Sequence, residues 1–89
     1  MEVVLTRLAI SDIAWTRTYI ARFNPMAADR MARRLREAAL SLSSFPDRGR
    51  LRPDGLRELT IIFPYLIIYR VEPNRITIVT IRHGARKPE

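Results

Sequence analysis

The chain has 89 residues, of which 47% are hydrophobic, and a formal net charge of +7. This length allows one domain with one modest core, so residues 1–89 are predicted to form a single domain. The absence of cysteine and the single histidine exclude a disulfide framework and a zinc centre. No stretch approaches the roughly 20 apolar residues of a membrane span, and the N-terminus is not organised as a signal peptide, so we expect a cytoplasmic protein without membrane contact.

The positive charge itself predicts a partner of opposite sign. A strong positive field attracts nucleic acid or an acidic protein. Of the 16 cationic side chains only Lys87 is a lysine, and arginine is the better bidentate partner for carboxylate or phosphate. A solvated basic surface without a specific partner is the alternative.

The N-terminal third is predicted to form a strand and a helix. Residues 2–6 alternate so that Val3 and Leu5 share one face, which is typical of a short strand. A helix is predicted to begin at Ser11. Projection at 100° per residue gives it one apolar face with two aromatic residues at the flank, formed by Ile13, Thr16, Ile20 and Phe23 and flanked by Trp15 and Tyr19.

A second helix is predicted directly after the first. Asn24 is a favourable cap and Pro25 a favourable first residue, so the two helices should form a hairpin. Its apolar stripe is rich in alanine and consists of Ala28, Met31, Ala32, Leu35, Ala38, Ala39 and Leu42. Leu40 instead projects between Arg33 and Arg36 on the polar side. It is either an ordinary exposed leucine or an anchor for a partner.

Phe45-Pro46 ends the second predicted helix, and residues 47–55 are predicted to form a polar loop. This loop contains Arg48, Arg50 and Arg52 together with Asp47 and Asp54. The arginines could contact phosphate groups, but the aspartates offer local partners and the segment lacks the pattern of a phosphate-binding motif. A structural loop is therefore favoured.

The last third has the period of strands. Residues 56–63, 65–71 and 75–82 are three apolar segments separated by Pro64 and by the turn at 72–74. Such short links predict an antiparallel meander. We therefore predict an α+β fold in which an N-terminal strand, a two-helix antiparallel hairpin and a three-stranded meander share one sheet.

Four motifs follow one another along these elements. They are FP..GR at 45–50, G.REL at 55–59, Y.I.YRV at 65–71 and I.HGAR at 81–86. Their order and spacing resemble the RelE/ParE superfamily of bacterial type II toxins over almost the whole chain. This resemblance implies a toxin held in a hetero-oligomer by a cognate antitoxin whose C-terminal segment is often acidic. It also implies that operator DNA is contacted only through the antitoxin.

The superfamily has two activities, of which RelE-like members cleave mRNA on the ribosome. Such cleavage needs a general base, a general acid and cations that stabilise the phosphorane. If this chain were such an endoribonuclease, its candidate catalytic residues would be Arg57, Glu58, Arg82, His83 and Arg86. The sequence departs from the RelE-like pattern, because Leu66 stands where those enzymes have an arginine and no tyrosine lies near the C-terminus.

ParE-like members instead inhibit DNA gyrase by binding, without a cofactor and without catalytic residues. The G.REL motif and the terminal HGAR followed by proline resemble this branch, which we favour over RNA cleavage and over a non-toxic basic binding module. The expected target-binding residues are Arg82, Arg86 and Lys87. Those expected to bind the antitoxin are Trp15, Tyr19 and Leu40, with Arg33 and Arg36 pairing with acidic side chains.

Overall fold

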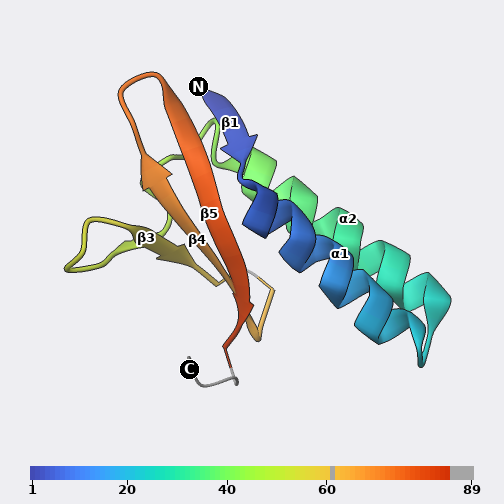
Figure 1. Cartoon of the computed structure of the whole chain (residues 1–89). Coiled ribbons are helices and arrows are strands. Elements are labelled where there is room, and N and C mark those ends of the chain that lie inside the picture. The colour runs from blue at the N-terminus through green and yellow to red at the C-terminus, as the bar shows by residue number, and fades with distance from the viewer. Residues whose placement is uncertain (61, 85–89) are drawn as a thin grey trace.

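The computed structural model describes residues 1–60 and 62–84, which form two helices and a five-stranded sheet (Figure 1). In chain order the elements are β1 (Glu2–Leu5), α1 (Arg7–Ala21), α2 (Pro25–Ser41), β2 (Arg50–Leu51), β3 (Arg57–Leu59), β4 (Tyr65–Val71) and β5 (Arg75–His83). The strand order is β1-β5-β4-β3-β2, with β1 parallel to β5 and every other pair antiparallel. The predicted α+β fold with its helical hairpin and meander is confirmed.

The hairpin begins earlier than predicted. The side chain of Thr6 caps α1, accepting a hydrogen bond from the backbone N–H of Ala9 at 3.0 Å and donating one to the carbonyl of Val79 at 2.7 Å. Ser11 therefore lies inside α1 and does not start it. Asn24 caps α2 as predicted, since its side chain accepts from the N–H of Ala27 at 3.1 Å.

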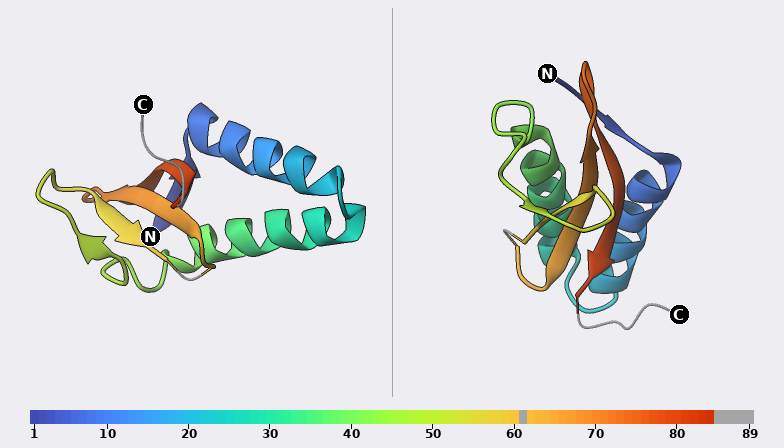
Figure 2. Two further views of the ribbon diagram at one scale, coloured as in Figure 1. Left: turned by 90° about the horizontal axis from the view of Figure 1, so that it is seen from below. Right: turned by 90° about the vertical axis from the view of Figure 1, so that its left-hand side faces the viewer.

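The predicted stripe of α2 forms the core with the sheet. Leu35, Ala39 and Leu42 are fully buried, and the same cluster contains Ala9 and Ile13 of α1 and the inward side chains of β3, β4 and β5, namely Leu59, Ile67, Tyr69, Ile76, Ile78 and Ile81. Phe23 was assigned to the buried face of the first helix and is 72% exposed. The reason is that Phe23 follows the last residue of α1, Ala21, and lies at the closed end of the hairpin. The closed end of the hairpin extends beyond the sheet (Figures 1 and 2).

Helix α1 provides hydrogen-bond partners for the part of the β5 edge that β1 leaves unpaired. β1 pairs with β5 only from Arg75 to Ile78. Farther along β5, the carboxylate of Asp12 in α1 accepts a hydrogen bond from the backbone N–H of Ile81 at 2.9 Å and one from the Thr80 hydroxyl at 2.5 Å. Because an exposed strand edge is a template for unwanted pairing, this contact also protects β5.

Residues 47–55 were predicted to be an irregular loop, but they contain β2. Arg50 pairs with Glu58 and Leu51 with Arg57 of β3. β3 itself covers only Arg57–Leu59 of the predicted segment 56–63. Within residues 1–60 and 62–84, no helix is long and apolar enough to cross a membrane.

Alternation along β4 gives the sheet two different faces. Ile67 and Tyr69 point to the helices, whereas Leu66 and Ile68 point to the opposite side. The side that carries Glu58, Leu66, Ile68 and Arg82 is called the open face below. Ile68 is buried although it does not belong to the core cluster shared with the helices, so part of the open face is also covered.

Candidate functional site

The open face carries a pocket of about 310 Å³. Leu66 and Ile68 form its apolar floor, while its rim consists of Arg50, Arg52, Pro53, Glu58, Arg82, His83 and Gly84. The Glu58 carboxylate lies 3.1 Å from the Arg50 guanidinium and 3.8 Å from that of Arg52. The pocket therefore contains more positive than negative side chains, and its single glutamate already has two cationic partners.

Glu58, Arg82 and His83 all line this pocket, but the His83 ring packs on Tyr65, its pair partner in β4, and Arg57 is directed elsewhere. The Arg57 guanidinium donates to the carbonyl of Gly49 at 2.8 Å and lies 3.5 Å from the Asp47 carboxylate. These contacts are on the helix side of the sheet, where Arg57 is paired with the buried Tyr69. Arg57 and Glu58 are thus neighbours in sequence on opposite faces. Arg86 lies outside the described residues.

His83 lies at the end of β5, where the chain leaves the sheet. Its ring meets the ring of Tyr65 edge to face, with centroids 5.3 Å apart. The next residue, Gly84, donates its backbone N–H to the carbonyl of Pro64 at 2.6 Å, and a Cβ there would lie 2.8 Å from the same oxygen. The first residue after β5 is therefore held against the turn between β3 and β4. Arg86 and Lys87, expected to contact the target, follow it outside the described residues.

An exposed aromatic row follows one side of α1. The rings of Trp15 and Tyr19 stack with centroids 5.4 Å apart, and Phe23 meets Tyr19 edge to face at 5.7 Å. The Arg22 guanidinium lies 5.8 Å from the Tyr19 ring centroid and 5.7 Å from that of Phe23. Sequence reasoning missed Phe23 as a surface residue, although the spacing of 15, 19 and 23 by four residues was a usable signal.

The expected antitoxin contacts of α2 also lie on the surface. Leu40 is 48% exposed, and Arg33 and Arg36 are exposed as well. Because Arg36 precedes Leu40 by four residues, the two side chains are neighbours on the outer side of the helix. Together with the aromatic row, these residues place apolar and cationic groups on the exposed sides of both helices.

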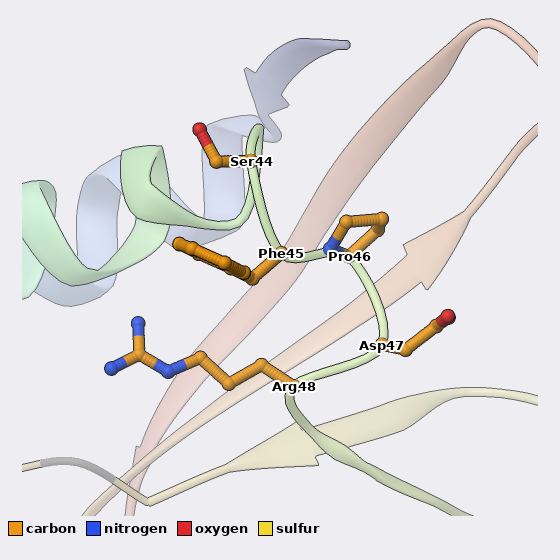
Figure 3. Close-up of a pocket in the computed structure, with 5 residues that line it drawn as sticks. All are labelled: Ser44, Phe45, Pro46, Asp47 and Arg48. Carbon is orange, nitrogen blue, oxygen red and sulfur yellow. The ribbon is translucent and has the colours of Figure 1, made fainter.

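A second pocket, of about 540 Å³, follows the C-terminal end of α2 (Figure 3). It is lined by Ser44, Phe45, Pro46, Asp47 and Arg48 and is called the 44–48 pocket below. Sequence reasoning identified this segment only as a helix end followed by a loop. The signal that pointed to it was the FP..GR motif, in which Phe45 is an apolar residue without a place in any predicted stripe.

The phenol of Tyr69 in β4 connects the backbone around the 44–48 pocket to the sheet through two hydrogen bonds. The hydroxyl of Tyr69 donates to the carbonyl of Pro46 at 2.8 Å and accepts from the N–H of Gly49 at 2.8 Å. Burial raises the pKa of the Tyr69 phenol. A Cβ at Gly49 would lie 2.7 Å from the Tyr69 ring, so the motif requires glycine here. Among residues 1–60 and 62–84, no three acidic or histidine side chains are grouped to hold a metal ion.

Three comparisons place the chain among known proteins. The sequence model of the family described as "ParE toxin of type II toxin-antitoxin system, parDE" matches residues 3–88. Toxin RelE2 of Caulobacter vibrioides is 49% identical over 85 residues, which cover 96% of this chain and 97% of that toxin. Toxin RelE3 of the same organism is 32% identical over 79 residues, covering 85% and 86%.

A solved structure has the same fold. It is a chain of the "Chromosomal ParDE TA system from P. aeruginosa", which superposes with a TM-score of 0.80 at 26% identity and covers 93% of this chain and 95% of that one. The superfamily resemblance inferred from the motifs is confirmed. The chain belongs to the ParE toxin family of type II toxin-antitoxin systems, within the RelE/ParE superfamily.

Proposed function

We propose that this toxin inhibits DNA gyrase by binding and is neutralised by a cognate antitoxin with an acidic C-terminal segment. The observation that carries the proposal is the placement of Arg57 and Glu58 on opposite faces of the sheet, each engaged by other side chains or backbone. A toxin that acts by binding needs no assembled set of catalytic groups. A nuclease does.

The contacts of Glu58 argue against its use as a general base. Its carboxylate is already engaged by two guanidinium groups, at 3.1 Å from that of Arg50 and 3.8 Å from that of Arg52. The cation nearest to it in sequence, Arg57, is unable to stabilise a phosphorane on the open face because it is bonded on the other side. Leu66, on the pocket floor, offers no charge either.

The target contact is proposed at the end of β5. Arg82 is exposed on the rim of the open-face pocket, and Arg86 and Lys87 continue the cationic sequence beyond the described residues. Docking of this end on gyrase would leave the cleaved DNA intermediate in place, so replication and repair would fail. No cofactor takes part, and the site of action would be the cytoplasm.

The antitoxin is proposed to bind the helical hairpin. Trp15, Tyr19 and Leu40 are exposed apolar side chains, and Arg33 and Arg36 offer partners for its carboxylates. Large apolar and arginine side chains dominate binding energies at such interfaces. Toxin and antitoxin would form a hetero-oligomer, in which operator DNA is contacted only by the antitoxin.

The direct test is a supercoiling and cleavage assay of purified gyrase on plasmid DNA with increasing amounts of the toxin. Loss of supercoiling or accumulation of cleaved DNA is expected, and addition of the antitoxin should reverse it. Unaltered gyrase activity in the presence of folded toxin would reject gyrase as the target.

A ribosome-dependent endoribonuclease is the second candidate. The open-face pocket supports it by gathering Glu58, Arg82 and His83, and the two relatives from Caulobacter carry the name RelE. In that case mRNA would be cut in translating complexes, and His83→Ala would abolish cutting without unfolding the protein. A basic binding module without toxicity would do neither, and its expression without antitoxin would not arrest growth.

A further inference from the structure

We propose that the 44–48 pocket receives an apolar side chain of the antitoxin and that Arg48 holds an adjacent carboxylate of the same segment. This inference rests on the proposed neutralisation by an acidic antitoxin and names a second anchor point for it. It extends the antitoxin surface from the outer side of α2 past the end of that helix.

The pocket is formed before any partner arrives. Tyr69 holds its backbone at Pro46 and at the adjacent Gly49, and Arg57 adds a hydrogen bond to the Gly49 carbonyl at 2.8 Å. Tyr69 itself is fully buried in the core. Binding to a rigid pocket avoids the entropic cost of ordering a loop, which favours affinity.

The lining suits an apolar side chain. Phe45 is 63% exposed and, with Pro46, supplies the large apolar groups that line a volume of about 540 Å³. This volume falls in the range typical of sites that accept small apolar groups. Covering a large aromatic ring removes apolar surface from water, which is the main favourable contribution to most protein associations.

The positive charge of Arg48 beside the pocket favours an antitoxin segment in which an acidic residue lies next to the bound apolar side chain. The Arg48 guanidinium donates to the Ser41 hydroxyl at 3.0 Å, which fixes it next to the end of α2 while the residue stays exposed. Phe45 and Arg48 extend in the same direction (Figure 3). An aromatic ring and a guanidinium on one side fit a peptide in which an apolar residue lies close to an aspartate or glutamate.

The pocket continues the surface already assigned to the antitoxin. Arg36 and Leu40 lie four residues apart on the outer side of α2. The N–H of Ser43 donates to the carbonyl of Leu40 at 3.1 Å, so a tight turn leads from Leu40 directly to Ser44. An acidic segment bound along Arg36 and Leu40 would therefore lie next to the pocket.

The charge of +7 makes a basic occupant unfavourable, and nucleic acid fits the lining poorly. Proteins that bind single strands combine a positively charged groove with several aromatic platforms for the bases. Here one ring and one arginine line the pocket, and Asp47 lies beside them. An amphipathic acidic peptide is the partner that matches both the ring and the guanidinium.

The test measures binding of the antitoxin encoded beside the toxin gene by isothermal titration calorimetry. Phe45→Ala should weaken binding about tenfold or more, as expected for an aromatic anchor, and Arg48→Gln should weaken it several-fold. Phe63→Ala is the matched control, because Phe63 also precedes a proline and is 86% exposed, and its affinity should stay within about twofold. Ser44→Trp should weaken binding by filling the pocket while retaining every existing contact.

Two results would overturn the inference. If wild type binds and the folded pocket variants bind as tightly as Phe63→Ala, the pocket is not an antitoxin site, although the proposed function stands. If Phe45→Ala loses gyrase inhibition and keeps full antitoxin affinity, the occupant is the target instead. Absence of any antitoxin binding by wild type would reject the proposed neutralisation itself.

Discussion

The Tyr69 hydroxyl lies 2.8 Å from the backbone nitrogen of Gly49, at a position where both residues are buried. Tyr69→Phe removes the acceptor of that N–H and the donor to the Pro46 carbonyl. An unsatisfied buried polar group costs about 1–3 kcal/mol, so the free energy of unfolding should fall by that amount. Denaturant titration would measure it, with Tyr19→Phe on the exposed side of α1 as the control. Equal stability of the two variants would contradict the assigned role.

The same phenol predicts a loss of stability in alkaline solution. Burial raises the pKa of Tyr69 in the folded state, so the folded protein holds this proton more tightly than the unfolded chain does. Its contribution is complete below pH of about 10, the ordinary pKa of tyrosine, and is lost as the pH rises through the raised folded-state pKa. Unfolding free energies measured between pH 8 and 11 should fall more steeply for wild type than for Tyr69→Phe. Parallel curves would be inconsistent with the raised pKa.

The turn between β4 and β5 predicts a lowered pKa for the carboxyl group of Glu72. The Thr77 hydroxyl donates to Glu72 at 2.6 Å and the Arg75 side chain donates to it at 3.3 Å, and these contacts lower the pKa of Glu72. The stability that Glu72 contributes is therefore present above its ordinary pKa and lost as the pH falls through the lowered value. Thr77→Val should raise the pKa of Glu72, measured by NMR titration of the side-chain carboxyl. Arg75→Gln should raise it less, because the hydrogen bond from Thr77 is the larger cause.

The hydrogen bonds that Asp12 accepts join α1 to β5 and should contribute to the free energy of unfolding. Asp12→Ala leaves the Ile81 N–H and the Thr80 hydroxyl without their acceptor at the edge of β5. A hydrogen bond to a charged group contributes about 1.5–3 kcal/mol, so we expect a loss of that order and faster hydrogen exchange at Ile81. Asp29→Ala, which removes an exposed ion pair with Arg17 between the helices, is the control and should change stability by less than about 1 kcal/mol.

The sequence was sufficient to predict the fold because its strongest signals are periodic. The alanine-rich stripe of α2, the Asn24-Pro25 boundary and the apolar segment 65–71 each combine a period with a boundary residue. The start of α1 was missed because Thr6 and Ser11 are both good capping residues. Tertiary structure decides between them, since the Thr6 hydroxyl also donates to Val79, which is distant in sequence. A strand of two residues such as β2 has no detectable period at all.

The candidate site was less predictable because it also depends on contacts between segments that are distant in sequence. Alternation along β3 was enough to separate Arg57 from Glu58, once the strand was known. The partners of Glu58 were not predictable, because Arg50 reaches it only through the pairing of β2 with β3. The 44–48 pocket depends on Tyr69, which contacts it from another strand. Contacts between segments distant in sequence thus determine what each motif can do.

Glu58 offers the sharpest discrimination between binding and catalysis. Glu58→Gln removes two partially exposed ion pairs, with Arg50 and Arg52, each of which should contribute less than about 1 kcal/mol to the unfolding free energy. If the toxin acts by binding, growth arrest and gyrase inhibition by this variant should persist, because Arg50, Arg52 and Arg82 keep their charges. A general base contributes typically 10²–10⁴-fold to a rate, so loss of toxicity by that factor would instead favour RNA cleavage.

Arg82→Gln is the matched variant from the same pocket. It removes the exposed cation proposed to contact gyrase and leaves the Glu58 ion pairs unchanged. Loss of about 1.4 kcal/mol of binding would require about ten times more toxin for half-inhibition of supercoiling, measured beside wild type and Glu58→Gln. Antitoxin affinity should remain within about twofold, since the antitoxin surface is assigned to the helical hairpin and the 44–48 pocket. Reduced activity of Glu58→Gln together with full activity of Arg82→Gln would reverse the two assignments and make the glutamate the functional group of the open face.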